Sequence, residues 1–304
     1  MAQLNTSAIP NIVTLRGIDM VIQHDWDNRA PVGRTIFNVR NSSQYQEDVQ
    51  TVGGVGLFSV KPEGTSVNYQ NINDGFRSTF THITYALGMR ITHEMMSDEL
   101  YGVMEGMGKE LAASAAATEE ALLASHFNNA TSTSYKGADG VPLFSASHVR
   151  EDGTTYSNTT DTDLSKAALE TGLIAFRNFR DGGGKRLNIK PATLLIPPDL
   201  IFTASRLLQS EYNPVVNNTA SDDGPMAANP LNALGIKIVP WDYMTETDMW
   251  ALLAPKSQHK LIMYDREAFG TDYIYDFDTG DYKIKGQFRM SSGWADPRGI
   301  YGSY

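Results

Sequence analysis

The sequence predicts an α+β protein with two lobes, and three patterns in the chain support this prediction. Large apolar side chains occupy every second position of residues 83–91, which is typical of a strand with one buried face. Residues 97–128 contain no proline and carry apolar residues at steps of three and four, which predicts a long helix. Residues 273–290 alternate again on both sides of a turn at 278–281, which indicates a β-hairpin. We therefore expect an antiparallel sheet that is covered by the long helix.

The composition is that of a globular protein. The chain has 304 residues, of which 41% are hydrophobic and 20% are charged. The absence of cysteine excludes disulfides, thiolate metal ligands and a cysteine nucleophile. No stretch approaches the roughly 18 apolar residues of a membrane span. The formal net charge of −10 argues against tight binding to duplex DNA, although such a charge can equally serve only to keep a protein in solution.

The N-terminal residues 1–50 show little periodicity and are rich in Asn, Gln and Asp. Their apolar residues come in short groups, so we expect an extended arm that lies against another surface. A tail without fixed structure is the alternative.

Residues 51–76 are expected to form an extended hairpin loop. Two β-prone runs, at 55–60 and 65–69, flank a turn in which Pro62 suits the second position of a type I turn and Gly64 the fourth. An isolated two-stranded hairpin is only marginally stable in water, so this one should pack on a further surface. That surface is either the core of the same chain or another copy of the protein.

If the partner is another copy, the contact is made by one set of residues in this loop. The residues expected at the contact are Val55, Leu57, Pro62, Gly64, Val67 and Tyr69.

The middle of the chain, residues 161–255, is expected to be a compact α/β lobe. The elements predicted there are a helix that starts near Asp163 and ends before Gly182, a strand at 193–196, a helix at 200–208 and strands at 236–239 and 249–253. The flanking residues 77–160 and 256–304 should form the other lobe, with the helix at about 97–128 as its beam. The α/β lobe is then an insertion between two parts of the first lobe.

No constellation of residues predicts catalysis. Ser257 and Lys260 have the S-x-x-K spacing of acylating serine enzymes, but the companion motifs S-D-N and K-T-G are absent. Asp276, Asp278 and Asp281 lie close together in an order that breaks the EF-hand pattern. We therefore expect no catalytic residue, no cofactor and no metal.

Several strings, in this order, resemble the major capsid proteins of tailed bacteriophages, and Mu-like head subunits in particular. The strings are Ile91-Thr92-His93-Glu94 with Asp98, Asp139-Gly140-Val141-Pro142-Leu143-Phe144-Ser145 with His148 and Asn158, Ile196-Pro197-Pro198, and Asp296-Pro297-Arg298-Gly299-Ile300-Tyr301. The order of the predicted elements resembles that family as well. The resemblance extends from about residue 50 to the end of the chain.

The resemblance implies a tailed-phage major capsid fold with four named parts. These are an N-terminal arm at 1–50, an extended loop at 51–76, a peripheral domain at 77–160 and 256–304 whose spine helix lies at about 97–128, and an axial domain at 161–255.

It also implies a structural subunit, not an enzyme, that forms hexamers and pentamers of an icosahedral capsid. The capsid would enclose double-stranded DNA without reading its sequence. The implied partners are other copies of the chain, with scaffolding, portal and decoration proteins and no membrane. The expected location is the virion, after assembly in the host cytoplasm. Two alternatives remain, which are an encapsulin-type compartment shell and a hydrolase that uses Ser257 and Lys260.

Overall fold

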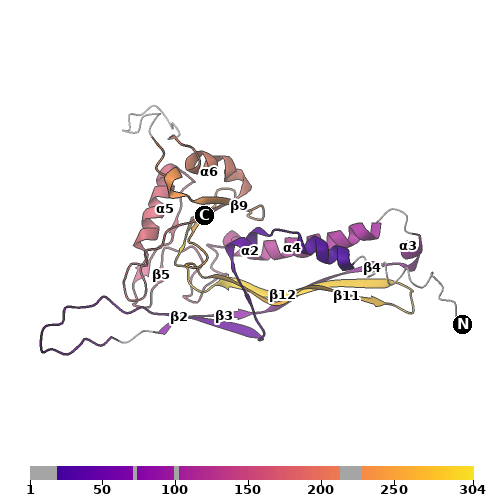
Figure 1. Cartoon of the computed structure of the whole chain (residues 1–304), viewed down its shortest axis with the longest axis horizontal. Helices are drawn as coiled ribbons and strands as arrows, with labels where there is room; N and C mark the ends of the chain where they lie inside the picture. Colours follow the sequence, from indigo (N-terminus) through magenta and orange to yellow (C-terminus); the bar gives the residue numbers. More distant parts are fainter. Residues whose placement is uncertain (1–18, 71–73, 99–102, 213–227) are drawn as a thin grey trace.

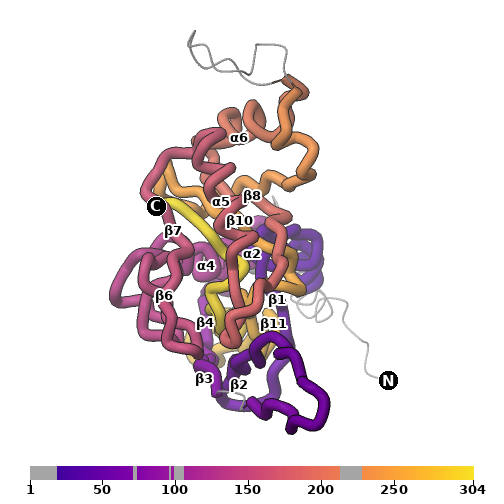
Figure 2. The backbone as a smooth tube through the Cα atoms, turned by 90° about the vertical axis from the view of Figure 1, so that its left-hand side faces the viewer, coloured from indigo at the N-terminus to yellow at the C-terminus, as the bar shows by residue number. Residues whose placement is uncertain are grey.

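The computed structural model describes residues 19–70, 74–98, 103–212 and 228–304, which form two lobes (Figure 1). The first lobe is built on a four-stranded sheet with the strand order β1-β11-β12-β4. The second is built on a five-stranded sheet with the order β7-β13-β10-β8-β9. A long loop projects from the first lobe, away from both sheets (Figures 1 and 2).

The first sheet is centred on a long C-terminal hairpin of β11 (Leu261–Tyr275) and β12 (Tyr282–Trp294). Strand β4 (Ile83–Ile91) adds antiparallel to β12, and β1 (Asn38–Asn41) adds parallel to β11 at the other edge. The pairing predicted from the two alternating segments is therefore confirmed.

The burial of β4 differs from the prediction. Ile91 is buried and Tyr85 is half-buried, but Ile83 and Leu87 are exposed although they lie on the same face of the strand. The physical reason is position, because β4 is the edge strand and the long helix packs mainly on β12. The alternating pattern identified the strand correctly but overstated how much of its apolar face is covered.

The predicted long helix is present as α4 (Val103–Asn128), but its predicted start at Ser97 is wrong. A separate short helix, α3 (His93–Ser97), ends there. It begins after Thr92, whose hydroxyl accepts a hydrogen bond from Met95 N at 3.3 Å. Residues 99–102 lie outside the described residues.

The expected extended arm is wrong for the described part of residues 1–50. Residues 19–27 are helical, and α2 (Val32–Ile36) packs on α4. After β1, strand β2 (Gln46–Val52) pairs antiparallel with β3 (Asp74–Thr81). These elements are too short to show a periodicity, and contacts with the first lobe define them. The expectation for residues 1–18 lies outside the described residues.

The second lobe contains the predicted helices α5 (Lys166–Asn178) and α6 (Ile201–Leu208). Short 3₁₀ turns lie at Pro198–Leu200 and Asn232–Leu234. The strands of its sheet are β7 (Thr159–Thr160), β13 (Ile300–Ser303), β10 (Trp250–Leu253), β8 (Thr193–Ile196) and β9 (Lys237–Pro240).

The prediction that the second lobe ends at residue 255 is wrong, because the end of the chain returns to it. Strand β13 lies between β7 and β10, and Tyr301 packs in the core of the second lobe. All four residues of β13 are buried, so the strand offers no alternation from which its sheet could be predicted. The chain therefore enters the second lobe twice.

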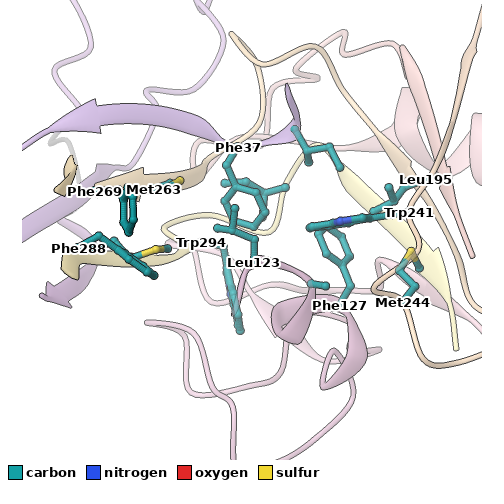
Figure 3. Packing of buried hydrophobic residues seen from close by; sticks show 14 of the residues in the cluster. Phe37, Leu123, Phe127, Leu195, Trp241, Met244, Met263, Phe269, Phe288 and Trp294 are labelled. Atoms are coloured by element: carbon teal, nitrogen blue, oxygen red, sulfur yellow. The ribbon is translucent and has the colours of Figure 1, made fainter. Parts of the chain in front are cut away.

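A tryptophan that follows a strand of the second sheet packs in the core of the first lobe (Figure 3). Trp241 comes directly after β9 and is fully buried. Its ring meets Phe127 of α4 edge to face, with the ring centroids 6.0 Å apart. Because aromatic rings prefer such offset or edge contacts, this packing holds the two lobes together. Among the described residues, no helix is long and apolar enough to cross a membrane.

Candidate assembly surface

The loop between β2 and β3 exposes a row of large apolar side chains. Leu57 is 79% exposed and Tyr69 is 89% exposed, while Phe58 and Val60 are almost completely exposed. All six residues predicted at the contact lie in this loop and are exposed, namely Val55, Leu57, Pro62, Gly64, Val67 and Tyr69. Burial of this loop in the core of its own chain is therefore wrong.

The predicted pairing inside the loop is also wrong. Among the described residues 53–70 no strand is formed, and the paired strands are β2 and β3 at its base. One hydrogen bond crosses the loop, from Gly56 N to the Gln70 side-chain oxygen at 2.8 Å. The backbone of this segment is therefore extended and largely without partners in its own chain.

A turn at the tip of the loop reverses the chain, one residue later than predicted. Thr65 N donates to Pro62 O at 3.3 Å, so Pro62 is the first residue of the turn and Gly64 the third. Gly64 has a φ of 78°, which glycine adopts without the steric cost of a side chain. A positive φ at the third position is the signature of a type II turn, not the predicted type I.

The base of the loop is held against the second lobe. A Cβ on Gly183 would lie 2.6 Å from Gly54 O, so the two backbones approach as closely as glycine allows. Gly183 belongs to the turn after α5, where the Asp181 carboxylate accepts hydrogen bonds from Gly183 N at 3.0 Å and Lys185 N at 2.8 Å. The loop therefore projects from a fixed base.

An ion pair and a hydrogen bond fix the β2–β3 ribbon from which the loop extends. Asp48 on β2 accepts hydrogen bonds from the Arg77 guanidinium and, at 2.5 Å, from the Thr79 hydroxyl, both on β3. These two donors lower the pKa of the Asp48 carboxyl. Phe80 on the same ribbon packs against Tyr264 of β11, with the ring centroids 5.4 Å apart.

The described residues also expose large apolar side chains outside the loop. Examples are Ile174 on α5, Phe202 on α6, Leu87 on β4, Ile274 on β11 and Phe277 in the β11–β12 turn. They lie on both lobes. Ile174 and Phe202 belong to no pattern that predicts their exposure, and Leu87 and Phe277 lie in runs whose alternation predicts strands.

A buried charge network connects the N-terminal segment with α4 and the first sheet. Arg34 of α2 donates from Nε to Glu119 Oε1 at 2.5 Å and from Nη1 to Asp265 Oδ2 at 2.8 Å. Burial alone would lower the pKa of Arg34, but the hydrogen bonds and charges of the two carboxylates outweigh it and raise the pKa above its usual value. Arg34 thereby connects three elements through charge-assisted hydrogen bonds.

The neighbouring carboxylate, Glu120, connects the two lobes. Its side chain accepts hydrogen bonds from Gly33 N, at 3.0 Å to Oε1, and from the indole N–H of Trp241. Glu120 is buried, and this burial raises the pKa of its carboxyl even though both hydrogen bonds act in the opposite direction. No pattern in the sequence predicts this contact, because its three groups are far apart in the chain.

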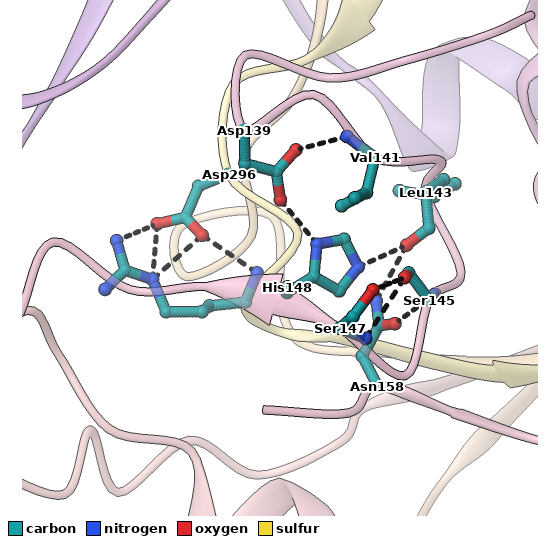
Figure 4. A network of polar contacts seen from close by, with 9 residues as sticks. Asp139, Val141, Leu143, Ser145, Ser147, His148, Asn158 and Asp296 are labelled. Atoms are coloured by element: carbon teal, nitrogen blue, oxygen red, sulfur yellow. Dashed lines mark hydrogen bonds and ion pairs between the residues drawn. The ribbon is translucent and has the colours of Figure 1, made fainter. Parts of the chain in front are cut away.

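The longest of the resembling strings, residues 139–158, is held by a network of hydrogen bonds (Figure 4). His148 is fully buried, with Nδ1 2.5 Å from Asp139 Oδ2 and Nε2 3.2 Å from Leu143 O. The Asn158 side chain donates to the same Leu143 O at 2.8 Å and accepts from Ser145 N at 3.0 Å. Asn158 O in turn accepts a hydrogen bond from Gly302 N, so this network is joined to β13 in the second sheet.

A second set of contacts holds the last string, 296–301, in place. Arg298 donates to Glu151 Oε1 at 2.9 Å and to Asp296 Oδ2 at 2.8 Å, and all three side chains are largely buried. These two of the resembling strings therefore have structural roles.

The residues considered for catalysis do not converge on a site. Ser257 and Lys260 are both exposed, and no hydrogen bond joins them. The Asp276 carboxylate pairs with Lys283, and that of Asp281 pairs with Arg90. Among the described residues, no group of three His, Asp or Glu side chains is placed to hold a metal ion.

The fold is similar to several solved shell proteins. A chain of Microbacterium phage Oxtober96 has a TM-score of 0.58 and 8% identity, over 90% of this chain and 91% of that one. The capsid of bacteriophage JBD30 has a TM-score of 0.57 and 13% identity, over 71% and 92%. The virus-like particle from Pyrococcus furiosus has a TM-score of 0.56 and 8% identity, over 95% and 98%. The predicted capsid fold is confirmed.

A family model described as "Phage capsid protein" matches residues 77–303, and the chain belongs to this family. Over 81 residues it is 30% identical to the Mu-like prophage FluMu major head subunit of Haemophilus influenzae. That match covers 27% of this chain and 24% of the relative, so it spans about a quarter of the relative's length. The protein is a structural capsid subunit, as the resemblance implied.

Proposed function

We propose that this subunit assembles into hexamers and pentamers of an icosahedral shell that encloses double-stranded DNA. The observation that carries the proposal is the projecting loop. Its side chains Leu57, Phe58 and Val60 are exposed and pack against no other part of the described chain. Burying apolar surface stabilises a complex by about 25 cal/mol per Å². Another subunit that covers these side chains is therefore the natural partner.

In this proposal the parts of the chain have distinct roles. The first lobe, with α4 as its beam, acts as the peripheral domain, and the second lobe lies at the capsomer axes as the axial domain. The loop reaches across the neighbouring subunit and places Val55, Leu57, Pro62, Gly64, Val67 and Tyr69 at the contact. Apolar residues exposed on α5 and α6, such as Ile174 and Phe202, then face neighbouring second lobes.

The proposed partners beyond other copies are a scaffolding protein, a portal and decoration proteins. The net charge of −10 suits a shell that encloses DNA without binding it tightly, because like charges repel across the inner wall. The proposed location is the virion, with assembly in the host cytoplasm, and catalysis plays no part.

Electron microscopy of the purified protein tests the proposal. At high concentration, or with a scaffolding protein, the subunits should form closed shells or free hexamers and pentamers. A protein that stays monomeric under all these conditions contradicts it. Particles from infected or induced cultures should then contain DNA that resists added nuclease.

The likeness to the virus-like particle from Pyrococcus furiosus supports a second candidate, an encapsulin-type compartment shell. The contents of native particles distinguish the two candidates. Nuclease-resistant DNA supports the virion, whereas an enclosed protein without DNA supports the compartment.

The hydrolase hypothesis has a direct test. Ester and amide substrates should show no turnover with the wild type, or equal turnover with Ser257→Ala. A loss of activity in Ser257→Ala alone would revive it.

A further inference from the structure

A basic patch lies at the end of α5 and in the segment that follows it, although the chain as a whole has a net charge of −10. The patch consists of four exposed side chains, namely Arg177, Arg180, Arg186 and Lys190. Arg177 occupies the last turn of α5, where a cation suits the helix dipole. The other three cations lie beyond the helix, so the dipole does not account for them.

The backbone of the turn after α5 places two of these cations opposite each other. Leu187 N donates to Phe179 O at 2.9 Å, and Arg180 and Arg186 form an antiparallel bridge just inside this hydrogen bond. Phe179 is buried, so the alternation of side chains along the backbone turns both arginines outward. Like charges that are directly opposite destabilise such a pairing. The arrangement is therefore unfavourable in the single subunit.

The basic patch has no acidic partner in its own subunit. Asp181, in the same turn, pairs with Lys185 at 3.3 Å instead. Arg180 donates to the backbone oxygen of Gly184 at 2.9 Å, and no side chain of the patch forms an ion pair among the described residues. The patch is therefore both charged and open to solvent.

An acidic turn lies on the same lobe, between β9 and β10. Its exposed carboxylates are Asp242, Glu246 and Asp248. None of them forms an ion pair in the described part of the chain, and Asp248 accepts a hydrogen bond only from the hydroxyl of Thr247. The turn is fixed, because Asn128 Nδ2 of α4 donates to Tyr243 O at 2.9 Å. Side chains between the acids are buried, namely Trp241, Met244 and Met249.

The basic patch and the acidic turn lie on opposite sides of the second lobe. Helix α5 packs on β13, near one edge of the five-stranded sheet, whereas the acidic turn follows β9, the strand at the other edge. Figure 1 shows α5 and β9 on opposite sides of this lobe. The two surfaces do not meet within one chain, but the patch of one copy can meet the turn of the next. A head-to-tail contact of this kind generates a ring when its rotation closes.

We propose that the basic patch of one subunit binds the acidic turn of its neighbour in the ring. The inference rests on the proposed function, since hexamers and pentamers are such rings, and it names the charges that join their second lobes. Complementary charges of this kind favour the correct partner and register more than they add affinity. The contact also neutralises the opposed arginines, which are unfavourable in the single subunit.

Exchange of the charges tests the proposal. The first variant reverses the patch with Arg180→Glu and Arg186→Glu, and the second reverses the turn with Asp242→Lys and Asp248→Lys. The third variant combines all four changes, so that the two surfaces are complementary again. Circular dichroism shows whether each variant is folded, and light scattering measures the protein concentration at which rings or shells form.

A control variant carries Lys136→Glu and Arg206→Glu, which change the net charge as much as the first variant does, at two other exposed positions. A reversed variant that does not fold is replaced by neutral changes, Arg186→Gln for the patch and Asp242→Asn for the turn. Their losses should be smaller and should not add when the two changes are combined, because they remove the same contact.

The first and second variants should each need about tenfold more protein for assembly than the wild type, and the combined variant should return to within about threefold of it. Net charge alone cannot produce this result, because the first two variants change it in opposite directions. The control should assemble like the wild type.

Three results overturn the proposal and leave the proposed function intact, because the wild type still assembles. The first is a reversed patch or turn that assembles no worse than the control. The second is a combined variant that assembles no better than the two variants from which it is built. The third is a reversed patch that assembles normally but yields native particles without DNA, which assigns the patch to nucleic acid. A wild type that stays monomeric contradicts the proposed function and the inference together.

Discussion

Glu120 and Trp241 join the two lobes, because the carboxylate on α4 accepts a hydrogen bond from the indole N–H that follows β9. The same carboxylate accepts from Gly33 N, so a single side chain ties the N-terminal segment to both lobes. A subunit that bears load within a shell needs such a junction, where Leu195 of β8 and Ala251 of β10 also pack in the core of the first lobe.

Removal of the Glu120 side chain should therefore be costly. In Glu120→Ala the indole N–H of Trp241 and Gly33 N remain buried without acceptors, each at a cost of about 1–3 kcal/mol. We expect the free energy of unfolding, measured with urea, to fall by about 3 kcal/mol. The control Glu110→Ala changes an exposed residue of the same helix and should stay within about 0.5 kcal/mol of the wild type. Equal effects of the two variants would show that Glu120 does not hold the lobes together.

Arg34 should be far more sensitive to substitution than a cation that is paired only at the surface. Arg34→Met leaves Glu119, which is almost completely buried, and Asp265 without their partner. Breaking a buried pair on one side typically costs about 3–5 kcal/mol. Arg29→Met removes a surface pair with Asp25, one helical turn away, and should cost less than about 1 kcal/mol. Thermal or urea unfolding of the two variants measures the difference, and similar losses would contradict the network.

Acid should destabilise the subunit partly through His259. Its ring is buried, and desolvation, together with Lys256 and Lys260, lowers its pKa to about 4. Its Nδ1 accepts a hydrogen bond from Leu261 N at 3.3 Å, which requires the neutral ring. The folded state therefore binds this proton less readily than the unfolded chain. The neutral His259 ring therefore contributes to the free energy of unfolding. This contribution is complete above pH 6.5 and falls by about 3 kcal/mol as the pH falls toward 4.

His259→Asn tests this pH dependence, because its side-chain oxygen can still accept from Leu261 N. Between pH 7 and pH 4 the wild type should lose about 3 kcal/mol more of its unfolding free energy than the variant does. Parallel stability curves over this pH range would rule out a titrating His259.

The close approach of Gly183 to Gly54 allows a test of whether assembly depends on the position of the base of the loop. A methyl group in Gly183→Ala would collide with Gly54 O and displace the base of the loop. We expect a folded subunit that needs about tenfold more protein for assembly, equivalent to about 1.4 kcal/mol. Gly106→Ala lies on α4, where nothing stands within 4 Å of the added methyl group, and should assemble normally. Light scattering measures both, and normal assembly of Gly183→Ala would show that the base need not be fixed.

The sequence predicted those elements whose apolar pattern is set by the element itself. Strand β12 alternates because one of its faces is covered, β4 has the same pattern although its apolar face is covered only in part, and α4 lies against β12. Strand β13 was assigned to the wrong lobe because Ile300–Ser303 is buried on both faces. Helix α2 was missed because five residues cannot show a helical period, and its position depends on Glu120.

The candidate site was predicted in part. The sequence located the projecting loop, since β-prone residues around a proline and glycine turn mark a hairpin. It omitted Phe58 and Val60, which are among its most exposed residues, because the alternating pattern selected only the other face.

Sedimentation velocity of a variant that lacks residues 55–69, measured beside the wild type, shows whether this loop joins the subunits. The deletion removes the exposed tip and leaves the β2–β3 ribbon intact. The account predicts shells or capsomers for the wild type, and a folded variant with unchanged circular dichroism that sediments as a small species. Stable shells of the deletion variant, indistinguishable from those of the wild type, would contradict the claim that this loop joins the subunits.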